Sequence, residues 1–309
     1  MRAAAADLFG DTGAVEQRTN AGLEARAPTC KRPVAQFRPQ CPRRLPRMSI
    51  TRRVVLASVG LAAPAYAQTN ITWRVLSPGL DHATAHVQST IGDRRLDVLR
   101  IDPARARFTM LVAAATNAAP RTARQWANEN GLIAATNAGM FRTNRLPVGY
   151  CKANGRVLQP TLSADRSIFT FDENNARLLD LSCDAFDPTA HENAIQSIRM
   201  ISCEGRNVWR QQPRIWSTAC IAEDSAGKIL FLHARSPLSV HDFINAIRAQ
   251  PLGITRAMYL EGGPEATLFA RAANGDVIER FGSFETGFNE NDDNNVAWPL
   301  PNIIGVVPR

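Results

Sequence analysis

The sequence lacks the short motifs that mark several common catalytic and metal sites. Its six cysteines include no CxxC pair, which argues against a zinc site. There is no glycine-rich phosphate loop, no GxSxG nucleophile motif, and no His and Asp pair at metal-ligand spacing. These absences remove zinc-binding modules, P-loop proteins and GxSxG hydrolases from consideration.

Most of the chain has almost no excess of basic over acidic side chains. The net charge of +8 is carried almost entirely by residues 1–67, which hold 11 Lys and Arg against 4 Asp and Glu. Residues 68–309 hold 25 basic against 24 acidic side chains. Because a nucleic-acid-binding domain normally shows a basic excess, we expect no nucleic-acid partner.

Long apolar runs are also absent. The run Val54–Ala63 has ten residues, whereas a membrane-spanning helix needs about 20. It follows the pair Arg52-Arg53 and precedes a small-x-small cleavage site, Ala65-Tyr66-Ala67. These parts predict a twin-arginine-like export signal and a periplasmic or secreted protein without a stable membrane anchor. An uncleaved anchor is the alternative, which the short run disfavours.

The chain divides into three predicted parts. Residues 1–47 are a disordered leader or a mis-assigned start, and residues 48–67 are the signal peptide. Residues 68–309 form one folded domain.

Four cysteines fall in the predicted domain: Cys151, Cys183, Cys203 and Cys220. An exported chain with an even number of cysteines is able to form two disulfides, in any of three pairings. Buried free thiols are the other interpretation, and the sequence leaves both open.

Turn signals separate short apolar segments throughout residues 68–309, a pattern typical of a sheet-rich domain. Strands are expected at 71–76, 84–90, 95–101, 107–113, 132–137, 166–171, 177–182, 197–203, 215–222, 228–234, 254–260 and 302–307. Helices are expected at 120–130, beginning at Pro120, and from a cap at Ser239 to Pro251. The predicted fold class is α+β, with mixed, mostly antiparallel sheets and a few packed helices.

Two Asn-Gly pairs predict hairpin turns, at Asn154-Gly155 and Asn274-Gly275. In a tight turn of this kind both central residues need a positive φ, which Asn and Gly tolerate best.

Each predicted helix precedes a strand that ends in a polar segment with glycine. The first such end is TNAGMF (136–141) and the second is LEGGPE (260–265). Ligands tend to bind beyond strand ends, where loops present side chains without disturbing the sheet. We therefore expect both segments to face one cleft.

The order of three motifs resembles the phosphodiester glycosidase family. They are NAGMF (137–141), RIWSTACI (214–221) and YLEGG (259–263). This family includes the catalytic domain of the lysosomal uncovering enzyme, and the chain is similar to its exported bacterial members. Where the family has Asp before its glycines, this chain has Glu261.

The resemblance implies a three-residue catalytic set of Glu261, Arg214 and Asn137. A planar guanidinium is able to bind two phosphate oxygens, and a strand-end carboxyl group with raised pKa suits acid or base catalysis. The ordinary interpretations are a surface ion pair for Arg214, a solvated turn residue for Glu261 and a turn cap for Asn137. Predicted substrate-binding residues are Gly139, Gly262, Gly263, His233 and Glu265.

The function implied is exported hydrolysis of a sugar-linked phosphodiester, or a related bond, in envelope or extracellular polysaccharide. A non-catalytic periplasmic glycan-binding protein is the alternative. No cofactor is expected. The segment NENDDNN (289–295) is acidic enough to suggest Ca²⁺ as an alternative, but its spacing is not that of an EF-hand and favours a solvated loop. The sequence leaves open the sugar, its anomeric configuration, the bond cleaved and the oligomeric state.

Overall fold

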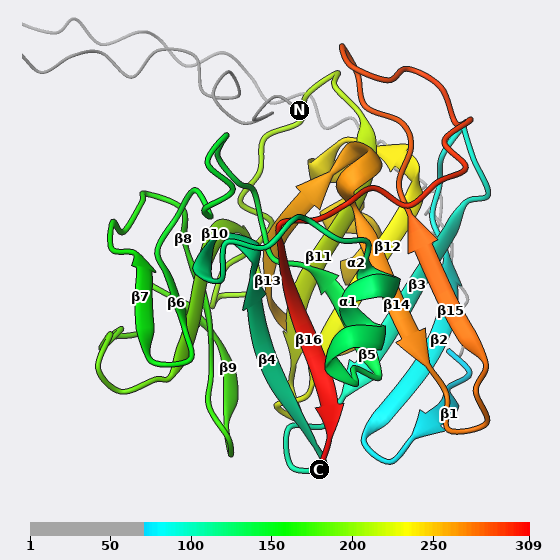
Figure 1. Cartoon of the computed structure of the whole chain (residues 1–309). Helices are drawn as coiled ribbons and strands as arrows, with labels where there is room; N and C mark the ends of the chain where they lie inside the picture. Colours follow the sequence, from blue (N-terminus) through cyan, green and yellow to red (C-terminus); the bar gives the residue numbers. More distant parts are fainter. Residues whose placement is uncertain (1–70) are drawn as a thin grey trace, which may run out of the picture. The chain divides into compact units, whose positions relative to one another are not determined.

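Antiparallel β-strands are the main regular structure in the part of the chain that the structure describes. The computed structural model describes residues 71–309 (Figure 1). The predicted leader and signal peptide, 1–47 and 48–67, lie outside the described residues. No helix within 71–309 has the length and apolar character needed to cross a membrane.

The larger sheet has eleven strands, of which nine follow the order β1-β2-β3-β12-β11-β13-β10-β6-β7, with β8 pairing with β10 and with β9. Its strands are β1 (Arg74–Ser77), β2 (Leu80–His86), β3 (Arg95–Ile101), β6 (Cys151–Ala153), β7 (Arg156–Gln159), β8 (Arg166–Phe171), β9 (Ala176–Asp180), β10 (Asn193–Ile201), β11 (Trp216–Asp224), β12 (Ile229–Leu238) and β13 (Ile254–Gly262).

The smaller sheet has five strands in the order β15-β14-β5-β16-β4. They are β4 (Ala106–Val112), β5 (Ala134–Asn137), β14 (Thr267–Arg271), β15 (Val277–Phe281) and β16 (Asn302–Pro308). Short 3-10 turns are η1 (Ala113–Ala115) and η2 (Gly263–Glu265), and the helices are α1 (Ala123–Asn130) and α2 (Val240–Ala249).

Both helices connect strands that are not neighbours. Helix α1 leads from β4 to β5, with β16 between them, and α2 leads from β12 to β13, with β11 between them. Every recorded strand pair in residues 71–309 is antiparallel. The mostly antiparallel prediction is confirmed. The predicted α+β class with mixed sheets and a few packed helices is corrected, because the described residues hold two α-helices and are predominantly β. No mixed pairing occurs among them, because an intervening strand removes the parallel pairing that such crossovers usually give.

The helix ends follow local capping chemistry. The Thr122 side chain accepts from the Gln125 N–H, Gln125 accepts from the Thr122 N–H, and Gly131 ends α1 with φ 66°. The helix thus starts at a capping box and not at the predicted Pro120. Ser239 caps α2 by accepting from the Asp242 N–H, as predicted.

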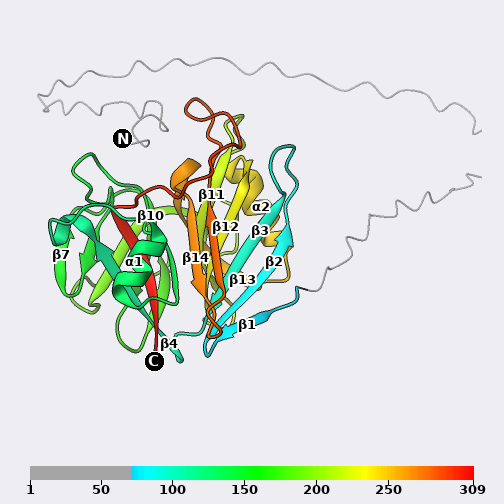
Figure 2. The ribbon, with the colours of Figure 1, turned by 45° about the vertical axis from the view of Figure 1, so that its right-hand side comes forward.

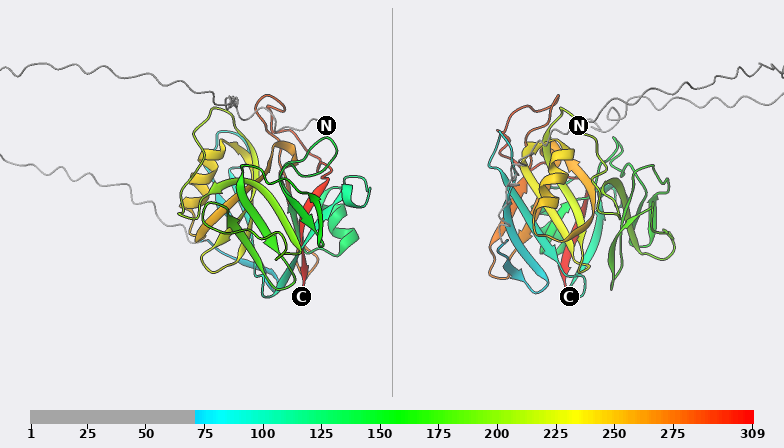
Figure 3. Two further views of the ribbon diagram at one scale, coloured as in Figure 1. Left: turned by 90° about the vertical axis from the view of Figure 1, so that its left-hand side faces the viewer. Right: turned by 180° about the vertical axis from the view of Figure 1, so that it is seen from behind.

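Each helix covers the outer face of one sheet. Helix α1 lies over the smaller sheet (Figure 2), and its Trp126 belongs to a buried cluster with Ile303 of β16. Helix α2 lies over the larger sheet (Figure 3), and its Phe243 and Ile247 belong to a cluster with Leu232 of β12. The apolar stripe of each helix is therefore buried against the sheet, which leaves the loops at the strand ends uncovered.

The main core lies between the two sheets. Phe108 of β4 contacts Phe169 of β8, with ring centroids 5.3 Å apart, and Phe231 of β12, at 6.1 Å. The nearly perpendicular contact with Phe169 is a favourable arrangement of two aromatic rings. These rings fix the spacing of the sheets on which the site is built.

Both predicted hairpins form, although with different turns. Asn154 and Gly155 both have positive φ, 49° and 75°, between β6 and β7. Of Asn274 and Gly275, only Gly275 has positive φ, because the loop between β14 and β15 is longer than two residues. The four flanking strands were not among the predicted ones; with three to five residues each they are too short to show a clear alternation.

Both predicted states of the cysteines, disulfide and buried free thiol, occur in the structure. Cys183 and Cys203 form a disulfide, while Cys151 and Cys220 are buried free thiols. Burial raises the pKa of Cys151 to about 12, so this thiol stays protonated and packs as an apolar group.

Asp97 links the two sheets through buried charge. Its carboxylate, 1% exposed, accepts from His82 of β2 at 2.8 Å and from Arg280 of β15 at 2.9 Å, and pairs with Arg95 at 3.1 Å. Burial alone would raise the pKa of Asp97, but the His82 hydrogen bond and the two arginines hold it below its ordinary value. The folded state therefore depends on an ionised Asp97.

We expect Asp97→Asn to lower the free energy of unfolding by about 3 kcal/mol, because it leaves Arg280 without its charge partner. Urea unfolding at pH 7 measures this change. The control is Asp276→Asn, whose ion pair with Arg74 is more than half exposed on both sides; it should lose less than about 0.5 kcal/mol. Equal losses would contradict a sheet-linking role for Asp97.

Candidate active site

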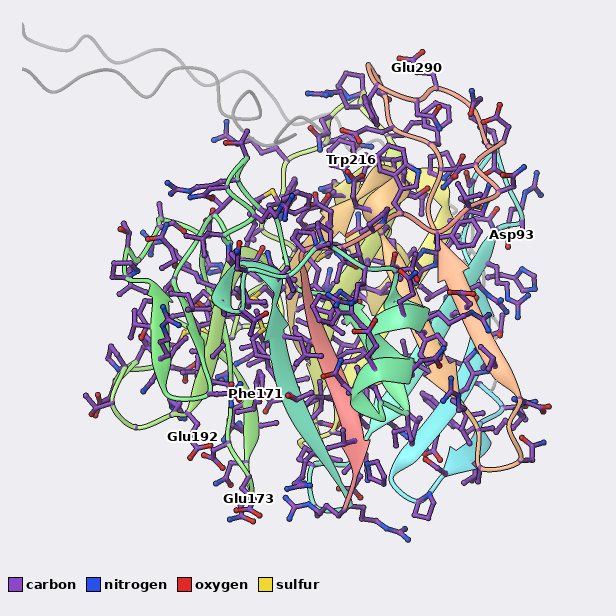
Figure 4. The ribbon with its side chains drawn as sticks, viewed as in Figure 1. Asp93, Phe171, Glu173, Glu192, Trp216 and Glu290 are labelled. Atoms are coloured by element: carbon purple, nitrogen blue, oxygen red, sulfur yellow. A yellow bond between two sulfur atoms is a disulfide. The ribbon has the colours of Figure 1, made fainter. Side chains whose placement is uncertain are left out.

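The site lies where β13 ends and the antiparallel strand β11 begins. Glu261 pairs with Ala219 across the ladder, and the next residue, Gly262, pairs with Thr218. This register brings the YLEGG and RIWSTACI motifs together. In Figure 4, Trp216 at the start of β11 lies at the same end of the molecule as Glu290 of the loop after β15.

A small pocket of about 20 Å³ occupies this end. It is lined by Met140, Arg214, Trp216, Tyr259, Glu261, Gly262 and Glu285. Five separate segments contribute: the turn after β5, the segment before β11, β11 itself, β13, and the loop between β15 and β16. Two of the three predicted catalytic residues, Glu261 and Arg214, therefore meet in one pocket.

Glu261 has little to stabilise its negative charge. Its recorded hydrogen bond is from the Gly262 N–H, at 3.4 Å. Burial raises the pKa of Glu261 well above its ordinary value, and the nearby carboxylates of Glu265 and Glu285 raise it further. Burial and the neighbouring acids therefore favour the protonated form of Glu261, which is the form able to donate a proton.

Two further acids surround Glu261. Burial raises the pKa of Glu265 to about 7, and the charge of Glu285 adds to the increase. Burial also raises the pKa of Glu285, but Arg214 opposes this increase. Among residues 71–309, Glu285 is thus the one acid of the three with a cation acting to favour its ionised form.

Arg214 retains most of its hydrogen-bonding capacity. One N–H donates to the Thr286 carbonyl at 3.3 Å, and no carboxylate of residues 71–309 lies within 4.0 Å of the guanidinium. A guanidinium has five N–H donors, so several are available to an anionic ligand.

Two aromatic side chains complete the wall of the pocket. The Trp216 Nε1–H is buried without a hydrogen-bond partner among the described residues. Burial raises the pKa of Tyr259 well above its ordinary value, with added effects from Glu261 and Glu285. Both groups thus remain neutral donors beside the acids.

The glycines of the motifs have packing roles. A Cβ on Gly262 would lie 2.5 Å from the Tyr259 hydroxyl. Gly263 has φ 63° and lies against the Glu285 carboxylate, and Gly139 has φ 81° and lies near the Leu260 carbonyl. Of the three, Gly262 alone lines the pocket. The chain needs glycine at these positions for close approach and left-handed backbone, independently of substrate.

Asn137 and His233 do not line the pocket but hold the turn that carries Glu265. Asn137 accepts from the Thr267 N–H at 3.1 Å, and the His233 ring N–H donates to the Ala266 carbonyl at 3.2 Å. Burial lowers the pKa of His233 to about 4, so the ring is neutral and able to donate through Nε2. The structure thus places these predicted site residues behind the site.

Sequence reasoning did not identify four of the pocket residues: Met140, Trp216, Tyr259 and Glu285. Met140, Trp216 and Tyr259 lie within NAGMF, RIWSTACI and YLEGG, so their position in these motifs could have identified them. Glu285 lies 24 positions after Glu261, in a loop with no local pattern, and reaches the pocket through the bridge that it forms with Trp216.

No candidate metal centre occurs at the pocket. Within residues 71–309, the one cluster of three donor side chains near enough to hold an ion is Asp180, Cys183 and Cys203. Its cysteines form the disulfide, so they are not available as thiolate ligands. In the NENDDNN loop, Asp292 pairs with Arg235 at 2.7 Å.

Comparison with known proteins supports the motif analysis. The Phosphodiester glycosidase family matches residues 130–307. No curated protein sequence matches the chain.

Two solved structures share the fold. The catalytic domain of zebrafish N-acetylglucosamine-1-phosphodiester alpha-N-acetylglucosaminidase superposes with a TM-score of 0.56 at 14% identity, covering 78% of this chain and 88% of that chain. A hypothetical protein from Synechocystis gives a TM-score of 0.57 at 15% identity, covering 78% of this chain and 64% of that chain. At these identities the likeness concerns the fold alone.

We expect Glu265→Gln to stabilise the protein above pH 7. The pKa of Glu265 is about 7 in the folded state and near 4.5 when unfolded, so its protonation favours folding below pH 4.5 and this stability is lost as pH rises through 7. Glutamine cannot ionise, so the variant should gain on the order of 2 kcal/mol at pH 8 and little at pH 4.

Urea unfolding at the two pH values measures the difference. Glu192→Gln, at an exposed position, is the control and should change neither value. A gain that is independent of pH would show that burial of the charge is not the cause.

Proposed function

The chain belongs to the phosphodiester glycosidase family, and we propose that it hydrolyses the bond between a sugar and the phosphate of a phosphodiester. The observation that carries this proposal is that Arg214, which has no carboxylate partner in the described chain, meets Glu261 in one pocket, where burial raises the pKa of Glu261 well above its ordinary value. The substrate class is a sugar-linked phosphodiester of envelope or extracellular polysaccharide.

The charge state of the pocket suits an anionic substrate. Three ionised acids would repel a phosphodiester, which carries one negative charge. The pKa values of Glu261, Glu265 and Glu285 are all raised, which makes the pocket less negative than three exposed glutamates would be. A phosphate group is then able to approach Arg214 against less repulsion from like charge.

Phosphate binding falls to the groups that have unused donors. The Arg214 guanidinium is able to contact two phosphate oxygens at once. The Trp216 Nε1–H, which has no hydrogen bond of standard geometry among the described residues and acts on the Tyr259 hydroxyl, offers a further donor to the same ligand. A bound phosphate would satisfy this buried group, which otherwise costs free energy.

Glu261 and Glu285 have the opposed environments that an acid and base pair requires. Glu261 donates its proton to the oxygen that joins the sugar to phosphorus, and this oxygen leaves with the phosphate. Glu285, favoured as a carboxylate by Arg214, accepts a proton from the water that attacks the sugar carbon. The products are a free sugar and a phosphomonoester.

We also propose that the protein acts outside the cytoplasm. The disulfide between Cys183 and Cys203 is consistent with an oxidising compartment, in agreement with the export signal expected at 48–67.

Hydrolysis in H₂¹⁸O tests the bond assignment. With the methyl diester of N-acetylglucosamine 1-phosphate as probe, we expect ¹⁸O in the sugar and none in the phosphate, read by mass spectrometry. Label in the phosphate would identify a phosphodiesterase that cleaves the phosphorus-oxygen bond, and would refute the glycosidase assignment.

Glu261→Gln should reduce kcat for this probe by about 10²- to 10⁴-fold, because glutamine keeps the shape but has no proton to donate. The control is Glu192→Gln at its exposed position. Binding of the probe by calorimetry should persist in the Glu261 variant. Undiminished turnover would remove Glu261 from its role.

The ionisation of Glu265 should appear in substrate binding. As pH rises through about 7, the new negative charge at Glu265 opposes the anionic probe, so KM should increase severalfold between pH 6 and pH 8. Glu265→Gln should flatten this increase. A steady-state pH profile of KM in both proteins is the measurement, and an identical rise in the two would exclude Glu265 as its source.

A further inference from the structure

The pocket is much smaller than any sugar phosphate. Its volume of about 20 Å³ holds roughly one water-sized group. Most of a bound substrate must therefore lie outside it, on the adjoining surface.

A groove of about 390 Å³ is available for that purpose. It is lined by Phe141, Arg142, Thr143, Arg145 and three prolines, Pro120, Pro299 and Pro301. This volume is within the range of sites that bind small organic ligands.

The groove and the pocket are built from the same two segments. One is the turn that begins at Met140, which lines the pocket, and continues with Phe141, which lines the groove. It is closed by the hydrogen bond from the Val148 N–H to the Met140 carbonyl at 3.0 Å. The other is the loop at 282–301, which supplies Glu285 to the pocket and Pro299 to the groove (Figure 1, orange to red).

The charge of the groove is entirely positive. Arg142 and Arg145 are exposed, and their recorded hydrogen bonds are to the carbonyls of Val148 and Ala118. No carboxylate lines the groove, and within residues 71–309 neither arginine has an acidic partner. Two guanidinium groups that line one groove and have no acidic partner among the described residues favour an anionic ligand.

Apolar faces beside the groove suit sugar rings. Phe288 is 61% exposed and contacts Trp298 edge to face, with centroids 6.0 Å apart. Trp298 directly precedes Pro299 of the groove. Exposed aromatic groups of this kind, next to a polar rim, mark ligand-binding surfaces.

We propose that the substrate is a chain of repeating sugar-phosphate units, and that the groove at Phe141–Arg145 binds the phosphate and sugar next to the one being cleaved. This inference rests on the proposed function and adds a substrate class to it. An isolated diester would occupy the pocket alone, whereas a longer chain would reach both arginines.

The test is the double variant Arg142→Ala/Arg145→Ala, assayed with two probes. One is the methyl diester of N-acetylglucosamine 1-phosphate, and the other is a polymer of N-acetylglucosamine 1-phosphate units. We expect kcat/KM for the polymer to fall at least tenfold more than kcat/KM for the short diester. The matched control, Arg248→Ala, removes an exposed arginine of α2 that lines neither hollow.

A double variant with the same loss on both probes, or no loss on the polymer, would overturn the subsite while leaving the proposed function intact. If the wild type cleaves neither probe, the proposed function fails, and calorimetric binding of the polymer still decides the subsite. Tenfold weaker binding in the double variant supports it, and equal binding overturns it. Equally tight binding of polyglutamate would also overturn it, because the groove would then select charge and not glycan.

Discussion

A carboxyl group removed from water must be paired with a cation or keep its proton, and this constraint organises the molecule. Asp97 takes the first solution, with His82 and Arg280 in contact with its carboxylate, and it joins the sheets as an ion. Glu261 is shifted toward the second, since its neighbours are other acids. The same chemical group is thus a structural anchor at one place and the proposed proton donor at the other, according to the charges around it.

The site depends on residues that never reach the pocket. His233 and Asn137 hold the backbone just after Glu265, at Ala266 and Thr267. Gly262 leaves room for the Tyr259 hydroxyl, and Gly263 leaves room for the Glu285 side chain. Acid groups that raise one another's pKa tend to move apart unless the backbone fixes them. The surrounding sheet therefore supplies the rigidity that preserves their coupling.

Much of this arrangement could be predicted from the sequence, because it is encoded locally. The cap at Ser239 and the turn at Asn154-Gly155 are each determined by a few adjacent side chains, and the motif order placed Arg214 and Glu261 together. The absence of parallel pairs among the described strands could not be predicted. It depends on distant strands, since β16 lies between β4 and β5 and β11 lies between β12 and β13. Glu285 could not be foreseen for the same reason: its position is set by a bridge to Trp216 across 69 residues of sequence.

The turn at Glu265 is tied to both sheets, through His233 of β12 on one side and Asn137 of β5 on the other. A change in the distance between the two sheets, which rings such as Phe108 help to set, would therefore move the backbone of this turn. Substitution of core side chains should therefore change the burial and the pKa of Glu265 with every residue of the pocket unchanged.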